Sequence, residues 1–144
     1  MIEKDTVRLL RECDAGIKMG VSSIDEVISC VSAQNLRTEL KNSKVEHEKL
    51  QEKTSSLLHC YEDEGKQPSA ISKGMSWIKT NVSLAMDNSD QTIADLVTDG
   101  CNMGVKSLSR YLNQYQAASE EAKGICNQLI GLEEKLAQDI RCYL

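Results

Sequence analysis

A six-residue segment that occurs twice is the feature that most constrains how this 144-residue chain can fold. Residues 13–18 read CDAGIK, and residues 101–106, which lie 88 positions later, read CNMGVK. Around each copy, mostly apolar or small residues recur at steps of three and four, the spacing of one face of an amphipathic helix. The first face comprises Leu10, Cys13, Ile17, Gly20, Ile24, Val27 and Val31, and the second comprises Thr98, Cys101, Val105, Leu108, Leu112 and Tyr115. The repeat therefore predicts two related helices.

A second pair of related faces follows, at an offset of 82 positions. One comprises Leu36, Leu40, Ser43, His47, Leu50, Thr54, Leu58 and Tyr61, and the other comprises Ala118, Ala122, Ile125, Leu129, Leu132, Leu136, Ile140 and Tyr143. The chain is therefore predicted to be a duplicated αα-hairpin, with the first hairpin at about 4–64 and the second at about 90–143. Because the offset falls from 88 to 82, the first hairpin carries six extra residues, which we place around 29–34.

Local signals mark the ends of these helices. Asn35 and Ser119 are predicted to cap the second and fourth helices, because Asn and Ser side chains accept hydrogen bonds from the free N–H groups of a first turn. Ser89 or Asp90 is predicted to cap the third helix in the same way. A glycine at 65 followed by the only proline of the chain predicts the end of the second helix.

Gly16 and Gly104 occupy equivalent mid-helix positions in the two copies of the repeat. Glycine costs roughly 1 kcal/mol relative to alanine inside a helix. Because both copies keep the residue, we predict that a neighbouring helix approaches closely at these positions. The alternative is that glycine is merely tolerated there.

About 25 residues, 65–89, join the two hairpins, whereas a tight helix–helix turn needs roughly two to eight. Apolar residues at 71, 75, 78 and 82 again step by three and four, which predicts a crossover helix at about 69–86. Such a helix is about 25 Å long, so the third helix can begin beside the start of the second and run parallel to it. Two hairpins joined by one long crossover define a ferritin-like four-helix bundle. The alternative is an up-down-up-down bundle with the extra helix across one end.

Residues 76–115 also resemble a family of bacterial ferritin-like four-helix proteins of unknown function. The resemblance rests on Trp77, on MD at 86–87, on MGV at 103–105 and on LNQY at 112–115, and it extends over nearly the whole chain. It implies one all-α domain over residues 1–144 and assigns no activity. The scarcity of aromatic residues, 3% with no Phe, and the single Pro favour the same helical class.

The charge and the cysteines of the chain limit which partners and which cellular compartment we expect. The net charge is −5 and no block of Lys or Arg stands out, which argues against nucleic acid as a partner. No apolar run approaches eighteen residues, and the first ten residues lack the apolar segment of a signal peptide, so we expect neither a transmembrane segment nor a leader. Six Cys without a CxxC pair predict reduced, structural cysteines in a cytoplasmic protein.

A di-metal site is the chemistry that a ferritin-like bundle would bring, and it requires inward-facing Glu residues and two Glu-x-x-His motifs. The chain contains no Glu-x-x-His, and the expected middle layer is Ile17, His47, Val105 and Leu129. We therefore predict no catalytic residues, no metal and no cofactor, with His47 as a weak metal candidate.

The two histidines and the paired glutamates have simpler interpretations. His47 is expected to be a core histidine bonded to Ser43, Asp14 or Asn102, and the alternatives are a metal or heme ligand. His59 is expected to be solvated. The sequential pair Glu133–Glu134 cannot share one helical face, so it makes a poor acid/base pair.

The predicted function is that of a non-catalytic helical bundle that associates with itself or with a protein partner. Trp77 and Leu84 share a face of the crossover helix next to its main stripe, which predicts a homodimer seated partly on them or, alternatively, a wider buried stripe. A different class of function is a metal-binding or oxidoreductase protein with a degenerate site around His47. A third is a peripheral membrane binder that uses the crossover helix.

Overall fold

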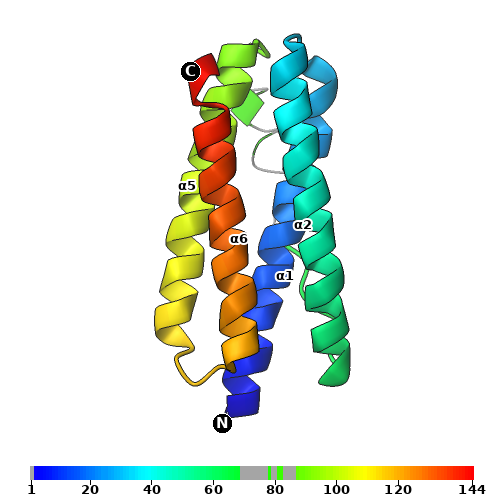
Figure 1. The fold of residues 1–144 in the computed structure, drawn as a ribbon, viewed down its shortest axis with the longest axis vertical. Helices are drawn as coiled ribbons and strands as arrows, with labels where there is room; N and C mark the ends of the chain where they lie inside the picture. The colour runs from blue at the N-terminus through cyan, green and yellow to red at the C-terminus, as the bar shows by residue number, and fades with distance from the viewer. Residues whose placement is uncertain (1, 69–77, 79–80, 83–86) are drawn as a thin grey trace.

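The computed structural model of the chain describes residues 2–68, 78, 81–82 and 87–144. These residues form an all-α bundle of four long helices with two short 3-10 helices, and none of them lies in a strand. Along the chain the elements are α1 (Ile2–Val27), η1 (Ile28–Cys30), α2 (Gln34–Cys60), α5 (Asp90–Gln114), α6 (Glu120–Asp139) and η2 (Arg141–Tyr143). Figure 1 shows the four long helices side by side. The predicted all-α class is confirmed.

Hydrogen bonds at the two ends of the bundle define the helix directions. The backbone N–H groups of Ser32 and Ala33, just before α2, each donate to the carboxylate of Asp90 at 2.8 Å. At the opposite end, the N–H of Ser119 donates to the hydroxyl of Thr6 at 2.8 Å. Therefore α2 and α5 begin at the same end and run parallel, whereas α1 and α6 run the other way (Figure 1). In an up-down-up-down bundle consecutive helices alternate in direction, so α2 and α5 would run antiparallel.

The predicted crossover helix at 69–86 falls largely outside the described residues, and so do Trp77 and Leu84. Of the stripe expected there, Ile78 and Val82 are described. Ile78 is buried, and Val82 is partly buried against the same apolar cluster, which includes Ile24 of α1 and Val97 of α5. This part of the connection therefore lies against the bundle.

The helix starts are confirmed at two of the three predicted places. The Ser89 hydroxyl accepts from the N–H of Thr92, and the Ser119 hydroxyl accepts from the N–H of Ala122. The prediction that Asn35 caps the second helix is wrong, because α2 begins at Gln34 and Asn35 lies inside its first turn. The start of α2 has no side-chain cap, and the Asp90 carboxylate, from the other hairpin, binds the N–H groups of Ser32 and Ala33 just before it.

Most aliphatic residues of the predicted stripes are buried, and they form two clusters along the bundle. One contains Leu10, Ile17, Leu50, Leu58, Leu108, Ile125 and Leu129, and the other contains Ile24, Val27, Leu36, Leu40, Leu136 and Ile140. Val105 is an exception, because it is only half-buried and does not complete the expected middle layer. Among the described residues, the polar side chains buried with the clusters are Thr6, Asp14, His47, Thr54 and Glu133.

All six cysteines are free. Cys13, Cys101 and Cys126 are buried, whereas Cys30, Cys60 and Cys142 are exposed. The prediction of reduced cysteines agrees with the six free thiols, of which three are buried in the core and three lie at or near the ends of helices.

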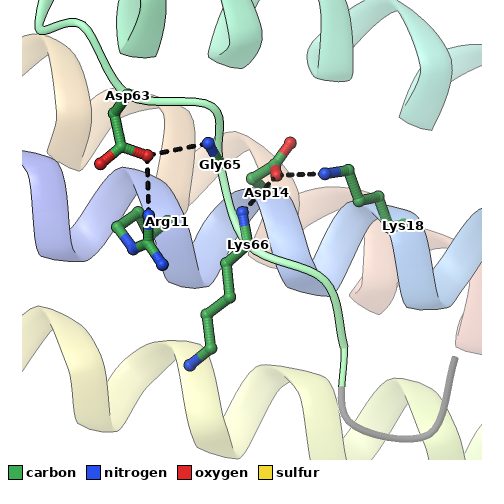
Figure 2. Close-up of polar contacts among 6 residues, drawn as sticks. All are labelled: Arg11, Asp14, Lys18, Asp63, Gly65 and Lys66. Atoms are coloured by element: carbon green, nitrogen blue, oxygen red, sulfur yellow. Dashed lines mark hydrogen bonds and ion pairs between the residues drawn. The ribbon is translucent and has the colours of Figure 1, made fainter. Parts of the chain in front are cut away.

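Residues 63–66, which follow α2, are attached to α1 by hydrogen bonds and ion pairs that we call the latch (Figure 2). Buried Asp14 of α1 accepts from the Lys66 N–H at 3.0 Å and from the Lys18 ammonium at 2.6 Å. Asp63 accepts from the Arg11 guanidinium and from the Gly65 N–H, both at 2.8 Å. These bonds hold residues 63–66 across α1. Asp14, which was considered as a partner of His47, is therefore engaged elsewhere.

Candidate functional site

A cavity of about 330 Å³ lies between α1 and α5, and side chains of α2 and α6 close its floor. Four glycines face it, Gly16 and Gly20 on α1 and Gly100 and Gly104 on α5. Most of the other described lining residues are apolar, among them Ala15, Met19, Leu96, Val97, Met103 and Leu129. The space exists because helix positions that carry long side chains elsewhere carry only a hydrogen atom at these four glycines.

Two of these glycines correct an expectation about the repeat. A Cβ built on Gly16 would lie 3.4 Å from the Leu129 side chain, and one built on Gly104 would lie 3.7 Å from Glu133. Both are ordinary contacts, so an alanine fits at either position without displacing a neighbour. The packing therefore does not require glycine at Gly16 or Gly104, contrary to the prediction of a close helix approach, and the two residues border the cavity instead.

A buried hydrogen-bonded pair, His47 of α2 and Glu133 of α6, forms the polar floor of the cavity. The His47 Nε2 lies 2.9 Å from the Glu133 Oε1, and the His47 Nδ1 lies 2.7 Å from the backbone oxygen of Ser43. The side chain of His47 is 1% exposed and that of Glu133 is 12% exposed. Both residues are therefore removed from bulk water while Glu133 still borders the cavity.

The partners of His47 fix where its protons lie. A carbonyl oxygen only accepts, so Nδ1 carries a proton that it donates to Ser43. A second proton lies between Nε2 and Glu133. When this proton is on Nε2, His47 is an imidazolium and Glu133 is a carboxylate, so the pair as a whole is neutral. Neither ring nitrogen remains free to bind a ligand.

The pKa of His47 is raised above its ordinary value by competing effects. Burial is the largest of them and by itself lowers the pKa, because it disfavours the charged ring. The hydrogen bond to Glu133, the negative charge of Glu133 and the hydrogen bond to Ser43 together outweigh burial. The structure therefore favours the imidazolium form of His47.

Cys101 of α5 adds a third side chain to this cluster. Burial raises the pKa of the Cys101 thiol, and the charge of Glu133 and a hydrogen bond to it raise that pKa further. The thiol therefore stays protonated, and its S–H is a weak donor toward Glu133. A protonated thiol in this setting is a poor nucleophile.

Gly20 is the glycine at which the packing is tight. A Cβ at this position would lie 3.1 Å from both Cδ2 and Nε2 of the His47 ring and 3.6 Å from the Glu133 Oε1. Contacts of 3.1 Å require the ring to move. The sequence placed Gly20 on a helical stripe but gave no sign that it borders the buried pair.

Polar residues at the rim of the cavity are paired with one another. Glu12 forms an ion pair with Lys66 at 2.5 Å, which continues the latch of Figure 2 toward the cavity. The pKa of Tyr111 is raised by its partial burial first, and then by the charge of Glu12 and a hydrogen bond to it. Residues 63–66 and the cavity rim therefore form one connected polar network.

A second hollow, of about 370 Å³, lies between α2 and α6. It is lined largely by charged and polar residues such as Glu39, Lys135 and Asp139, and the last two are already paired at 2.5 Å. Ligand sites are usually apolar with a few convergent polar groups, which describes the first cavity better.

Sequence reasoning identified His47 and Ser43 but missed Glu133. Asn102, considered as a partner of His47, is exposed, and His59 is exposed as predicted. Glu133 was interpreted only as half of a Glu–Glu pair, although it lies four residues after Leu129 and three before Leu136. That spacing places it on the apolar stripe and was the signal that could have found it.

The described residues contain no group of three or more His, Cys, Asp or Glu side chains that could hold a metal ion. His47, Glu133 and Cys101 come together, but they do not form such a group. Among the helices described, none combines the length and the apolar character that a membrane span requires.

Comparisons with protein-family models, with curated proteins and with solved structures found no match for this chain. The resemblance to ferritin-like bundles therefore remains an expectation, and the argument for function depends on the chemistry of the cavity.

Proposed function

We propose that this protein is a non-catalytic helical binding module, and that the cavity between α1 and α5 binds a small, largely apolar molecule. The observation that supports the proposal is an apolar cavity of about 330 Å³ with one polar cluster at its floor. Ligand sites commonly begin at roughly 300 Å³. A 150 Å³ cavity holds benzene, so this one has room for a molecule of about a dozen heavy atoms.

The state of the polar cluster supports a binding role rather than a catalytic one. Nucleophilic catalysis by a cysteine needs a thiolate, and general-base catalysis by a histidine needs a free ring nitrogen. Cys101 is held as a thiol, and both nitrogens of His47 are occupied by hydrogen bonds. Glu133 is the only member that keeps capacity for another contact, and a buried acceptor binds a ligand well.

A cavity-filling variant with a matched control tests the proposal. Gly104→Leu introduces a side chain into the cavity, whereas Gly124→Leu makes the same change at an exposed position of α6 with no atom within 4 Å of a Cβ. Both changes raise helix propensity equally. Naphthalene titrated into isotope-labelled protein should cause saturable NMR shifts along the facing parts of α1 and α5. These shifts should persist in Gly124→Leu and should disappear in folded Gly104→Leu. If the native chain shows no saturable binding of naphthalene, the proposal is contradicted.

Metal binding around His47 is the second candidate function, because His47, Glu133 and Cys101 converge there. A metal would have to displace the proton that lies between His47 and Glu133, and the raised pKa of His47 opposes that exchange. We expect elemental analysis of protein grown with iron and manganese to show no stoichiometric metal. A value near one metal per chain that is lost in His47→Ala would favour the metal-binding function instead.

Association with a second copy, with a protein partner or with a membrane surface through the crossover remains a prediction. Trp77 and Leu84, which carry the predicted homodimer, lie outside the described residues. The oligomeric state is addressed by a measurement described below, and it is independent of the ligand experiment.

A further inference from the structure

We propose that the cavity selects a neutral ligand that has an apolar body and one N–H or O–H donor, and that Glu133 accepts this donor. The inference rests on the proposed function and specifies its ligand class. It follows from the hydrogen-bonding capacity and the charge of the groups that border the cavity.

Glu133 keeps unused acceptor capacity at the cavity. A carboxylate has two oxygens with about four lone-pair positions. Oε1 receives the Nε2 proton of His47, and the Cys101 thiol is a further, weak donor to the same carboxylate. Oε2 lies on the side of Gly104, 3.7 Å from where a Cβ would stand, and Gly104 borders the cavity. A ligand that enters beside Gly104 therefore meets an acceptor.

The other floor groups cannot replace Glu133 in this role. His47 donates from both of its nitrogens to protein partners, so it offers a ligand neither a donor nor an acceptor. Cys101 is a weak donor that already faces the carboxylate. A ligand whose polar group only accepts hydrogen bonds would leave both itself and Glu133 unpaired in apolar surroundings, which is costly.

The charged side chains of the described lining disfavour ionic ligands. The charged side chains of the described lining include Glu12, paired with Lys66 at the rim, and Glu133, paired with His47, so an anion would lie beside two carboxylates. The imidazolium of His47 is already neutralised by Glu133. A cationic ligand would add a net positive charge to a neutral pair in an apolar cavity, which is also unfavourable. A neutral donor is the class that remains.

Four naphthalene derivatives of similar size provide the test, compared at a pH where 2-naphthol is neutral. They are 2-naphthol, 2-methoxynaphthalene, 2-naphthoate and 2-naphthylmethylamine, and unsubstituted naphthalene serves as the reference for the cavity itself. We expect 2-naphthol to bind about tenfold more tightly than 2-methoxynaphthalene, the effect of one hydrogen bond to a charged acceptor. The naphthoate and the amine should bind more weakly than naphthalene.

A double variant isolates the contribution of the polar floor. Changing only Glu133 leaves His47 buried without its partner and can prevent folding, whereas His47→Leu with Glu133→Leu removes both charges together. In the double variant naphthalene should still bind, and the tenfold advantage of 2-naphthol should vanish. If the advantage persists there, Glu133 is not the acceptor and the inference is wrong.

The remaining outcomes separate the inference from the proposed function. Equal or tighter binding of 2-methoxynaphthalene overturns the inference and points to the Ser23 or Ser107 hydroxyl as a donor. Tightest binding of the naphthoate or the amine overturns the assignment of a neutral ligand. In each of these cases the cavity still binds small molecules. If no member of the series binds, including naphthalene, the proposed function fails as well.

Discussion

The His47–Glu133 pair places two ionisable side chains in a core that is built mainly from aliphatic side chains. Burial of a charged pair is tolerated only when the remaining donors and acceptors are also satisfied. Ser43 meets that condition for the second His47 nitrogen, at 2.7 Å. Gly20 meets a steric condition, because it leaves the ring in place where an alanine would displace it.

The first prediction concerns the pH dependence of this pair. The folded-state pKa of His47 should exceed that of the unfolded chain, about 6.5, because Glu133 and Ser43 favour the imidazolium. Its contribution to stability should be fully present below about pH 6.5 and should be lost as the pH rises through the folded-state pKa. NMR of the His47 ring in folded protein and in concentrated urea measures both values. A folded value below the urea value contradicts the assignment, and the Leu/Leu double variant should lack this component of the pH dependence.

The second prediction concerns the cysteines. Iodoacetamide should modify exposed Cys30, Cys60 and Cys142 in native protein and should spare buried Cys13, Cys101 and Cys126 until the chain unfolds. A protonated thiol also reacts slowly. A hydrogen bond with Cys126 and burial raise the pKa of the Cys13 thiol, so Cys13 stays protonated. Mass spectrometry of peptides counts the labels at each site. Rapid native labelling of Cys101 would show that its thiol is neither protonated nor shielded, contrary to this expectation.

At the scale of elements, short polar contacts at the helix ends connect the two hairpins. Asp90 binds two N–H groups that precede α2, and Thr6 of α1 binds the N–H of Ser119 before α6. Each contact joins residues more than fifty positions apart. These contacts set which ends of the helices lie together, and the apolar stripes then determine which faces meet.

The third prediction tests the latch that follows α2. Gly65 has φ +90°, and a Cβ there would collide with the Asp14 carboxylate. Gly65→Ala should therefore cost about 2 kcal/mol or more in the free energy of unfolding, since the left-handed conformation alone costs roughly 1–2 kcal/mol for a residue with a side chain. Gly124→Ala is the matched control, because it lies at an exposed helix position and should gain up to about 1 kcal/mol. Urea unfolding measures both, and equal effects of the two variants would show that the latch does not restrain Gly65.

For the whole molecule, the arrangement of the four helices produces the cavity. The two hairpins are closely packed within themselves, and α1 and α5 meet across four glycines that leave a space of about 330 Å³. The chain between the hairpins borders this space at the described Pro68 and Ile78. Ligand binding and the attachment of the crossover are therefore expected to be linked.

The fourth prediction is the oligomeric state. Trp77 and Leu84 are expected to seat a homodimer, since Trp is frequent among the residues that dominate interface energies. Light scattering at tens of micromolar should report a dimer for the native chain and weaker association for Trp77→Ala/Leu84→Ala. Val45→Ala, at a side chain of α2 that is 47% exposed, is the control and should associate like the native chain. A native monomer at that concentration contradicts the prediction.

The sequence by itself determined the helices, because amphipathic periodicity and caps such as Ser89 and Ser119 act within a few residues of chain. It also identified His47 as a core histidine and included Ser43 among its three candidate partners, since that contact spans one helical turn. Both features depend on local geometry, which is the same wherever the helix is packed.

Only the tertiary structure decided the features that join distant segments. Glu133 is buried because His47, 86 positions away, meets it across the core, and the N–H groups of Ser32 and Ala33 before α2 are bound by Asp90 from the other hairpin. Gly16 and Gly104 line one cavity because α1 and α5 face each other there, an arrangement that spacing along one helix cannot reveal. The physical reason is common to all of them: periodicity determines which face of a helix is buried, but only packing determines what that face meets.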